Sequence, residues 1–489
     1  MGADLVALSH VQSRQMIRHL GKIFLIVVLV AASPLLRAQA PAHPPMLVFL
    51  HVTVINPGSN AVEQDRAVVI RGSRITAVTS AARFAAPEWA KVVDASGKYM
   101  IPGLWDMHVH TTFGDWFPRG QEVILPLFIA NGVTGVRDMG GDLPVLFAWR
   151  KEIAAGEIVG PRMVVSGPML DGYLPDGKLR FPSSIPVMTA ADAVKAVDSL
   201  KAQGVDFIKV QSVIPHDAYV AAAEEAHKQG LSFVGHVPDH IKITESVALG
   251  QKSIEHFMGV LEGCSSQEDK LLAGPTEDTK LLLTSRDDAR CRKLIALLAQ
   301  THTWLVPTMV WNRQGTLLDQ VDFAHQPLDK YVPAYWRDVT WKRFYDQMMP
   351  GVKADALSVR QQEIAEMIRM IGVLHKGGVE FMAGTDTAPG IYVMPGFSLH
   401  DELANFVEAG FSPMDALATA TSNPAKFLGR DDMGAVAPGD VADAVVLDAN
   451  PLVDIRNTEK IFGVVADGRY YDRTHLDAVL AGVERAAKQ

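Results

Sequence analysis

Eight short apolar runs alternate with longer helical patterns through the middle of the chain, and this alternation restricts the fold more than any other feature. The runs are Leu104 to His110, Val133 to Met139, Met163 to Leu170, Phe207 to Gln211, Phe233 to Val237, Ser253 to Phe257, Trp304 to Val310 and Glu380 to Asp386. Helical patterns lie between them, for example Ala190 to Gln203, Pro215 to Gln229 and Cys291 to Gln300. Such alternation is typical of parallel strands joined by helices. Eight units of this kind predict an α/β fold, a (β/α)₈ TIM barrel.

Both ends of the chain have a different texture. From Met46 to Lys98 short β-type runs are separated by turn residues, and the segments Asp443 to Leu447 and Ile461 to Val465 have the same character. Neither end has enough strands for an independent sheet. We therefore predict a small β-sandwich domain built from residues 41–100 and 430–489, with the barrel, residues 101–429, inserted between them. Two separate β-appendages are the alternative.

Residues 1–40 have the pattern of a signal peptide. Three basic side chains precede the apolar run from Ile23 to Ala32, and Ala38-Gln39-Ala40 follows as a small-x-small cleavage site. The run is shorter than the roughly 20 residues that span a bilayer. We therefore predict cleavage and export to the periplasm or the extracellular space, without stable membrane insertion afterwards. Met16 is an alternative start of this signal.

Net charge limits the classes of partner that the sequence predicts, and the cysteine content limits the number of disulfides. A formal net charge of -9 without long like-charge runs gives no electrostatic reason to expect a nucleic acid partner. The expected partner is a small-molecule substrate, and a homo-oligomer stays open. The two cysteines, Cys264 and Cys291, form one disulfide in an oxidising compartment or stay as two free thiols.

Imidazole, amine and carboxylate side chains lie at the ends of five of the expected strands. They are His108, His110, Lys209, His236, His256 and Asp386. Side chains of a strand alternate between its two faces, so His108 and His110 point to the same side. Catalytic groups of a TIM barrel lie at the C-terminal strand ends, and inward-facing groups of these types are costly without a partner. The set therefore predicts a divalent metal centre.

With these residues the chain resembles the amidohydrolase superfamily of metal-dependent hydrolases, from Met46 to Arg473. The segments Gly132 to Gly141, Ala420 to Ala425 and Gly439 to Asp443 carry the same resemblance. Within the superfamily the chain is similar to the branch that contains imidazolonepropionase-like proteins and metal-dependent dipeptidases. Imidazolonepropionase itself is mononuclear and does not use the lysine of the fourth strand. Lys209 therefore points away from that activity.

The resemblance implies a carboxylated Lys209 that bridges two divalent ions. His108, His110 and Asp386 would bind one ion, and His236 and His256 the other. Burial beside cations favours the neutral amine that reacts with carbon dioxide to give the carbamate. An ion pair between Lys209 and a carboxylate is the alternative. Zinc fits the nitrogen and oxygen ligands best, while manganese, cobalt and iron fit the same shell.

The resulting hypothesis is a binuclear amidohydrolase that cleaves a carbon–nitrogen bond, amide or peptide-like, of a dipeptide or an N-acyl amino acid. A hydroxide held between the ions would attack the carbonyl. Asp386 would accept the proton and deliver it to the leaving amine. The alternative is a mononuclear deaminase or a ring-opening hydrolase of imidazolone-type cyclic amides. A barrel that only binds a ligand is disfavoured, because it would have no chemical need for Asp386.

A substrate carboxylate would need a cationic or hydrogen-bonding partner at the barrel mouth. The candidates for such substrate contacts are Arg137, Tyr173, Gln211, His240 and His400, with Lys178 and Arg180 in a polar loop. Arg137 could instead form an internal ion pair, and His400 could serve at a helix start. The segment Arg313 to Gly351 is longer than a simple connection requires, and we expect it to cover the barrel mouth.

Overall fold

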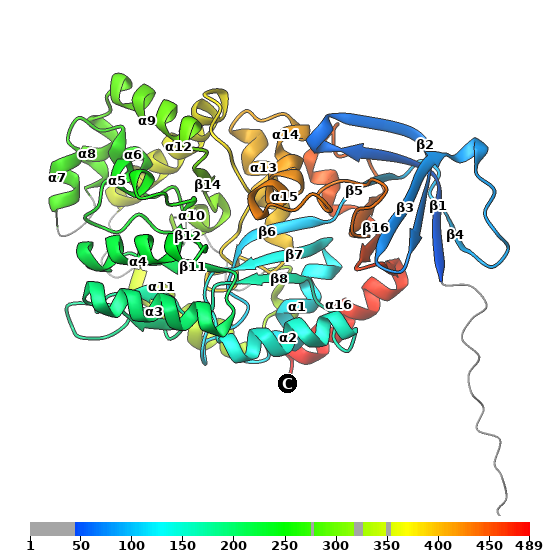
Figure 1. Cartoon of the computed structure of the whole chain (residues 1–489), viewed down its shortest axis with the longest axis horizontal. Coiled ribbons are helices and arrows are strands. Elements are labelled where there is room, and N and C mark those ends of the chain that lie inside the picture. The colour runs from blue at the N-terminus through cyan, green and yellow to red at the C-terminus, as the bar shows by residue number, and fades with distance from the viewer. Residues whose placement is uncertain (1–44, 275–277, 317–325, 349–353) are drawn as a thin grey trace, which may run out of the picture. The chain divides into compact units, whose positions relative to one another are not determined.

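The computed structural model describes residues 45–274, 278–316, 326–348 and 354–489 (Figure 1). The predicted signal peptide, the apolar run within it and Met16 lie outside the described residues, so cleavage and export stay predictions. His43–Gln489 form one compact unit. Among the described helices, none has the length and apolar character required to cross a bilayer.

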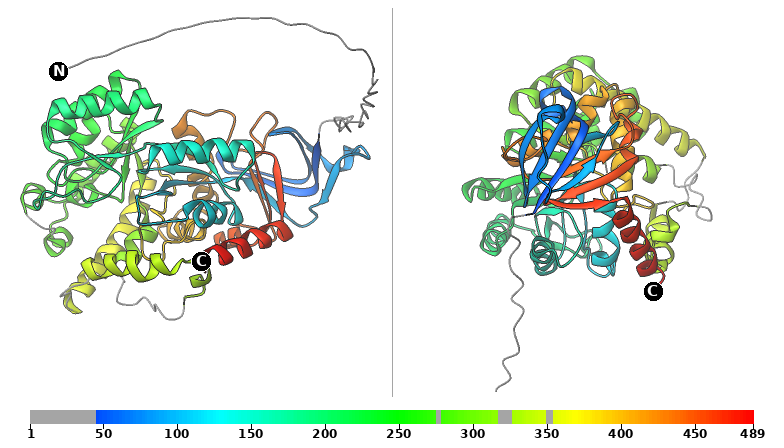
Figure 2. Two further views of the ribbon diagram at one scale, coloured as in Figure 1. Left: turned by 90° about the horizontal axis from the view of Figure 1, so that it is seen from below. Right: turned by 90° about the vertical axis from the view of Figure 1, so that its right-hand side faces the viewer.

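Strands from both ends of the chain form one eight-stranded sheet. Its members are β1 (Met46–Asn56), β2 (Ala61–Arg71), β3 (Arg74–Ser80), β4 (Lys91–Asp94), β5 (Tyr99–Pro102), β15 (Ala444–Leu447), β16 (Ile461–Ala466) and β17 (Arg469–Asp472). The order is β17-β16-β15-β5-β1-β2-β3, with β4 on β1. The two ends meet where β5 pairs antiparallel with β15, Met100 opposite Val446. Figure 2 shows the blue and red strands side by side. The two-layered sandwich and its boundaries stay predictions.

Parallel strands make up the middle of the chain. One sheet contains β6 (Leu104–Val109), β7 (Val133–Asp138) and β8 (Arg162–Val165). The other has the order β10-β9-β11-β12-β13-β14 and contains β9 (Met169–Asp171), β10 (Ser184–Pro186), β11 (Phe207–Val210), β12 (Ser232–Gly235), β13 (Ser253–Glu255) and β14 (Trp304–Val306). All pairings within these two sheets are parallel. The predicted α/β class is therefore confirmed.

The eighth expected run, residues 380–386, is not a regular strand in the structure. It nevertheless lies between β14 and β6, because backbone hydrogen bonds connect it to both. Leu305 N donates to Glu380 O over 2.9 Å, and Met107 N donates to Ala383 O over 2.9 Å. This places Asp386 beside the end of β6.

Helices follow the parallel strands. The longer ones are α1 (Gly120–Ala130), α2 (Leu143–Ala155), α3 (Ala190–Gln203), α4 (His216–Lys228), α9 (Asp288–Thr301), α10 (Met309–Thr316), α12 (Ala354–Lys376), α13 (Phe397–Glu408) and α16 (Arg473–Ala487). The shorter ones are α5 (Ile243–Ala248), α6 (Val260–Gly263), α7 (Glu268–Ala273), α8 (Thr279–Thr284), α11 (Lys342–Met348), α14 (Pro413–Thr419) and α15 (Ser422–Leu428). The expected helix from Ala190 to Gln203 begins at a capping box of Thr189 and Asp192. It ends at Gly204, whose φ of 89° a side chain would disfavour.

A disulfide links two parts of the chain between β13 and β14. Cys264, which follows α6, forms a disulfide with Cys291 in α9, with the Cα atoms 4.4 Å apart. Of the two alternatives for the cysteines, the structure shows the disulfide.

In the segment expected to cover the barrel mouth, residues 313–316 and 326–348 are described. Its buried Trp336 donates to Pro118 O over 3.3 Å and its buried Trp341 to Ala388 O over 3.3 Å. The segment thus packs on the chain that follows β6 and Asp386.

Candidate metal centre

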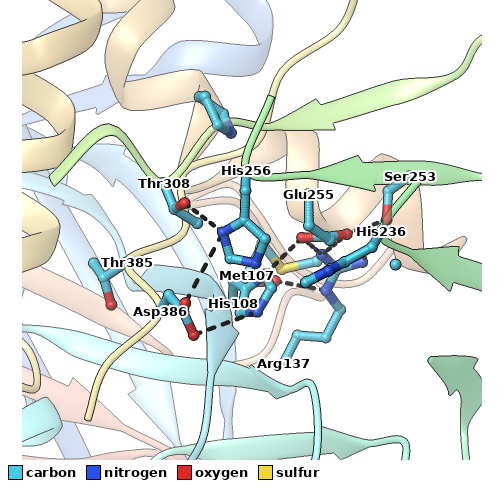
Figure 3. Close-up of polar contacts among 12 residues, drawn as sticks. Met107, His108, Arg137, His236, Ser253, Glu255, His256, Thr308, Thr385 and Asp386 are labelled. Carbon is cyan, nitrogen blue, oxygen red and sulfur yellow. Dashed lines mark hydrogen bonds and ion pairs between the residues drawn. The ribbon is translucent and has the colours of Figure 1, made fainter. Parts of the chain in front are cut away.

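Five of the predicted ligand residues lie in or directly after parallel strands, and Asp386 lies in the segment between β14 and β6. Figure 3 shows four of the six, His108, His236, His256 and Asp386, close together. His108 is the second-last residue of the apolar strand β6, and His110 comes directly after this strand. Lys209 is in β11, and His236 and His256 directly follow β12 and β13. His108, His110, Lys209 and Asp386 are buried, and His236 and His256 are partly buried. Residues from five separate segments therefore meet in one interior region.

Distances join these side chains into one cluster. Ligand atoms of His108, His256 and Asp386 all lie within 4.8 Å of one another, which a single ion could exploit. His110 Nε2 lies 3.3 Å from Asp386 Oδ1, and His108 Nε2 lies 3.6 Å from the same oxygen. The ring of His236 is centred 4.8 Å from that of His256. How the ligands divide between ions stays a prediction.

Hydrogen bonds set which nitrogen two of the imidazoles present. Burial lowers the pKa of His108 well below its ordinary value, so the ring is neutral. Its Nδ1 donates to Glu255 Oε2 over 2.8 Å, because an ionised carboxylate can only accept. His110 Nδ1 likewise donates to Gly140 O over 2.8 Å. Both rings therefore present a bare Nε2, the form that ligates a metal ion.

The other two imidazoles are positioned by hydroxyl groups. His236 Nδ1 lies 2.7 Å from Ser212 Oγ, and His256 Nδ1 lies 2.8 Å from Thr308 Oγ1. Burial lowers the pKa of His236 well below its ordinary value and that of His256 to about 3. His108, His236 and His256 are thus neutral at pH 7, as ligation requires.

Lys209 is fully buried, and its Nζ has no hydrogen-bond partner among the described residues. Burial lowers its pKa to about 8, although Glu255 and Asp386 act in the opposite direction. No described carboxylate lies within 4.0 Å of Nζ, so the ion-pair alternative has no partner in the described part of the chain. An unpaired buried amine is costly. It fits a lysine that carries a further group in the working protein.

Asp106 holds the segment that carries Asp386. Its carboxylate accepts hydrogen bonds from Thr385 N over 3.0 Å, from Thr385 Oγ1 over 2.6 Å and from His108 N over 3.2 Å. Burial raises the pKa of Asp106 to about 7. Asp386 itself has a φ of 60°, in the left-handed region that costs a non-glycine residue on the order of 1 kcal/mol. The surrounding hydrogen bonds hold Asp386 in that conformation.

Arg137 occupies an internal position. It is fully buried, and its guanidinium donates to Met107 O over 2.6 Å, to Ser253 Oγ over 3.0 Å and to both Glu255 oxygens over 2.9 Å. Every donor group is therefore directed at the protein interior behind His108 (Figure 3). We correct its suggested role as a substrate contact to that of an internal ion pair, with Glu255 as the partner.

The remaining candidates for substrate contacts differ in position. Tyr173 is exposed, and the exposed His240 donates from Nδ1 to Leu272 O over 2.7 Å. His400 is buried in α13, 3.0 Å from Thr458 Oγ1, and burial lowers its pKa to about 4. That position gives His400 a packing role. Gln211 directly follows β11, and its buried Oε1 has no partner among the residues described. Gln211 is thus the candidate whose free polar atom lies nearest in sequence to Lys209.

Sequence reasoning missed the supporting carboxylates Asp106 and Glu255. A signal for each was available. Asp106, His108 and His110 recur with the period of two that places side chains on one strand face. Glu255 is a charged residue inside the short apolar run that ends in His256. The hydroxyl partners Ser212 and Thr308 had no comparable signal.

Comparisons with known proteins identify the family. The family model described as "Amidohydrolase family" matches residues 99–470. Among curated proteins, imidazolonepropionase of Pseudomonas syringae pv. tomato is 34% identical over 64 residues, which cover 13% of this chain and 16% of that protein. Adenine deaminase of Deinococcus deserti is 51% identical over 41 residues, 8% of this chain and 7% of that protein. These matches thus span less than a fifth of either relative.

Solved structures match over nearly the whole chain. A putative prolidase from Bifidobacterium longum is 24% identical, with a TM-score of 0.65, covering 90% of this chain and 99% of that one. A bottromycin amidohydrolase is 20% identical, with a TM-score of 0.69 and 91% of each chain covered. A Xaa-Pro dipeptidase with bound methionine is 20% identical, with a TM-score of 0.63, covering 87% and 100%. At these identities the likeness shows a shared fold.

The family match covers most of the chain, including all six predicted ligand residues. The chain therefore belongs to the amidohydrolase family and is, as predicted, a hydrolase that acts on carbon–nitrogen bonds.

Proposed function

We propose that this hydrolase is a binuclear metal enzyme that cleaves the amide bond of a dipeptide or an N-acyl amino acid. The observation that carries the proposal is the unpaired, fully buried amine of Lys209 within a cluster of four histidines and Asp386. A single ion needs no such lysine, whereas a carbamate on Nζ supplies two oxygens to bridge a pair of ions. The step joins Nζ to the carbon of carbon dioxide and releases one proton.

His108, His110 and Asp386 would hold one ion, and His236 and His256 the other, with carboxylated Lys209 between them. The buried Nε2 of His108, which lacks a hydrogen-bond partner among described residues, fits this assignment. Neutral imidazoles and oxygen ligands suit zinc, and they also suit manganese, cobalt or iron. When bound, such ions lower the pKa of a water molecule and polarise the substrate carbonyl.

Asp386 is the residue proposed to move the proton. Its Oδ1 lies beside the Nε2 atoms of His108 and His110, and its backbone N donates to His108 O over 2.7 Å. The carboxylate would take a proton from the attacking water and return it to the nitrogen of the leaving amine. The hydrogen bonds from Thr385 to Asp106 hold the neighbouring Asp386 in one position. The same Asp386 carboxylate would therefore accept the proton and later donate it.

We further propose that the parallel strands close into a (β/α)₈ barrel, with residues 380–387 as its eighth member. Asp206 N donates to Val165 O over 2.9 Å and so connects the start of β11 to β8. Parallel bridges link Leu305 to Phe381 and Val109 to Thr387. A closed ring would bring the five ligand-bearing segments to one end of the barrel, where catalytic groups of this fold lie.

The dipeptide part of the proposal has a separate basis. Two of the similar solved structures are described as a prolidase and a Xaa-Pro dipeptidase. The curated matches, an imidazolonepropionase and an adenine deaminase, favour the second candidate, a mononuclear deaminase or cyclic-amide hydrolase. We place the binuclear hydrolase first, because the second candidate gives the unpaired Lys209 no role.

A hydrolysis screen tests the choice between these candidates. Metal-loaded protein would be assayed with dipeptides, N-acyl amino acids, imidazolone-type cyclic amides and adenine. We expect cleavage of a linear amide, and a lower kcat/KM for the methyl ester of the best substrate than for its free acid, by about tenfold or more. Release of ammonia from adenine, or ring opening without linear amide cleavage, would contradict the proposal.

We also propose export of the mature protein. The disulfide between Cys264 and Cys291 supports it, because disulfides persist mainly in oxidising compartments. N-terminal sequencing of protein secreted or recovered from the periplasm should give a start near Pro41. A start at Met1 in cytosolic protein with two free thiols would contradict export.

A further inference from the structure

A cavity of about 500 Å³ lies at the end of the parallel strands opposite to the metal centre. Thr134, Arg162, Phe207 and Ser232, which line it, are at or near the first residues of β7, β8, β11 and β12. Of these strands, β11 and β12 carry metal-ligand candidates, and Lys209 and His236 lie towards their other ends. Ser232 and His236, for example, are separated by about 13 Å at the rise of an extended strand. The cavity is therefore separate from the proposed active site.

The C-terminal part of the chain supplies the other wall. Residues of α15, of the chain leading into β15 and of the turn from β16 to β17 line this side, namely Phe427, Leu428, Arg430, Asp443, Asp467 and Arg469. The cavity thus lies between the parallel strands and the sheet made from both chain ends. Pockets at such junctions between structural layers are common ligand sites.

Positive charge is in excess around the cavity. The lining contains five cationic residues, Arg150, Arg162, Lys252, Arg430 and Arg469, and three carboxylates, Asp206, Asp443 and Asp467. Three of the cations have partners: Arg150 pairs with Asp206, Arg162 with Asp443 and Asp467, and Arg430 with Asp432 outside the lining. All three carboxylates of the lining therefore form ion pairs with arginines.

Lys252 and Arg469 contact no carboxylate within the described part of the chain. Lys252 Nζ donates to Phe427 O over 2.7 Å, and the Arg469 guanidinium donates to Ile153 O and Ala154 O over 3.1 Å each. Carbonyl oxygens satisfy hydrogen bonds but do not neutralise charge. Burial and the charge of Arg137 also lower the pKa of Lys252, whose ammonium lies 4.4 Å from the centre of the Phe427 ring. An anion in the cavity would stabilise both cations.

Apolar surface completes the cavity. Trp105, Met163, Phe207 and Phe427 line it, and its volume falls within the roughly 300–1,000 Å³ of small-molecule sites. The hydroxyl of Thr134 is buried in the lining, and among described residues it has no hydrogen-bond partner. We propose that this cavity is a second ligand site, which binds a small organic anion with an aromatic or branched apolar body through Lys252 and Arg469.

Calorimetric titration with a matched pair of probes tests this site. Naphthalene-2-carboxylate carries the anion and the apolar body, and 2-acetylnaphthalene has a similar shape without the charge. The holoenzyme should bind the carboxylate with one saturable site and bind the ketone at least tenfold more weakly. Lys252→Met and Arg469→Met should each weaken carboxylate binding by about tenfold or more, because each removes a charge-assisted contact. Neither variant should change binding of the ketone.

Lys426→Met is the matched control. Lys426 is exposed next to Phe427, pairs with Glu380 and does not line the cavity, so its loss should leave carboxylate binding unchanged. Equal binding in all three variants, or no saturable binding, would overturn the proposal. Binding that ignores Lys252 and Arg469 but disappears when a chelator removes metal would place the probe at the metal centre instead. If either variant fails to fold, the two probes are compared on the unaltered protein with and without a chelator. A preference for the carboxylate that persists after metal removal supports the site, and its loss overturns the proposal.

Discussion

His108 Nδ1 donates a hydrogen bond to Glu255 Oε2 over 2.8 Å, and both side chains are fully buried. Glu255 is held in turn by two hydrogen bonds from Arg137. A carboxylate in this position fixes the tautomer and the orientation of the imidazole and makes its other nitrogen more basic. Glu255 is therefore a positioning residue for the metal ligand His108.

Replacing Glu255 by glutamine should weaken metal binding. The variant Glu255→Gln keeps the size of the side chain but removes its charge, and loss of such a partner costs about 10–100-fold in metal affinity. Competition with a chelating dye measures the affinity directly. The control is Glu380→Gln, the same change at a residue that pairs with Lys426. An unchanged affinity in Glu255→Gln would show that Glu255 does not support the metal centre.

Replacing Arg137 should lower the free energy of unfolding and should have no direct effect on substrate binding. The variant Arg137→Met leaves Glu255 as a buried charge without its partner, which costs about 3–5 kcal/mol of unfolding free energy. Urea unfolding of metal-free protein gives this quantity. A variant of normal stability whose KM alone is raised would return Arg137 to the role of a substrate contact.

The role of Lys209 can be separated from its effect on folding. We expect Lys209→Ala to be folded, because it removes an unpaired buried amine, and to be inactive, because the proposed bridge between the ions is lost. Short carboxylic acids that enter the vacated space should restore part of the activity. Full activity of the variant without added acid would exclude the carbamate.

A buried carboxyl outside the predicted ligand set should make stability depend on pH. Glu402 accepts hydrogen bonds from Met309 N and Val310 N, and burial raises its pKa to about 7. Because the folded protein holds this proton above the ordinary glutamate pKa of about 4.5, its stabilising contribution is complete below that value. It is lost as the pH rises through about 7.

The comparison that isolates Glu402 is with Glu402→Gln, which cannot titrate. Relative to this variant, the intact protein should lose on the order of 3 kcal/mol of unfolding free energy between pH 4.5 and pH 8. Urea unfolding at both pH values measures the difference, and all other titrating groups are common to the two proteins. A difference that is the same at both pH values would contradict the raised pKa.

The sequence predicted the parallel strands because short apolar runs alternate with helical patterns, and the structure places a strand in seven of the eight runs. The run at residues 380–386 differs, since it contacts both neighbours through separated hydrogen bonds rather than a regular ladder. Short-range pattern cannot distinguish these cases, because the hydrogen bonds are made to β14 and β6. The alternation of strand and helix patterns carried most of the fold.

The ligand residues were predictable one by one, because an imidazole or amine inside an apolar run needs a partner. Their support was not. Arg137 and Glu255 are separated by 118 residues. Their ion pair forms because the two side chains, one from β7 and one from β13, meet in the interior. The neighbour of Arg137 in sequence, Asp138, instead accepts a hydrogen bond from Thr111 N. Pairing in the interior depends on packing across the fold, and a single sequence does not specify it.

The proposed mechanism requires two ions that act together. Elemental analysis of purified, fully active protein, combined with reconstitution of metal-free protein by stepwise addition of zinc, tests it most directly. We predict about two ions per chain and activity that appears only as the second equivalent binds. Full activity at one ion per chain would contradict the binuclear mechanism and favour the mononuclear candidate.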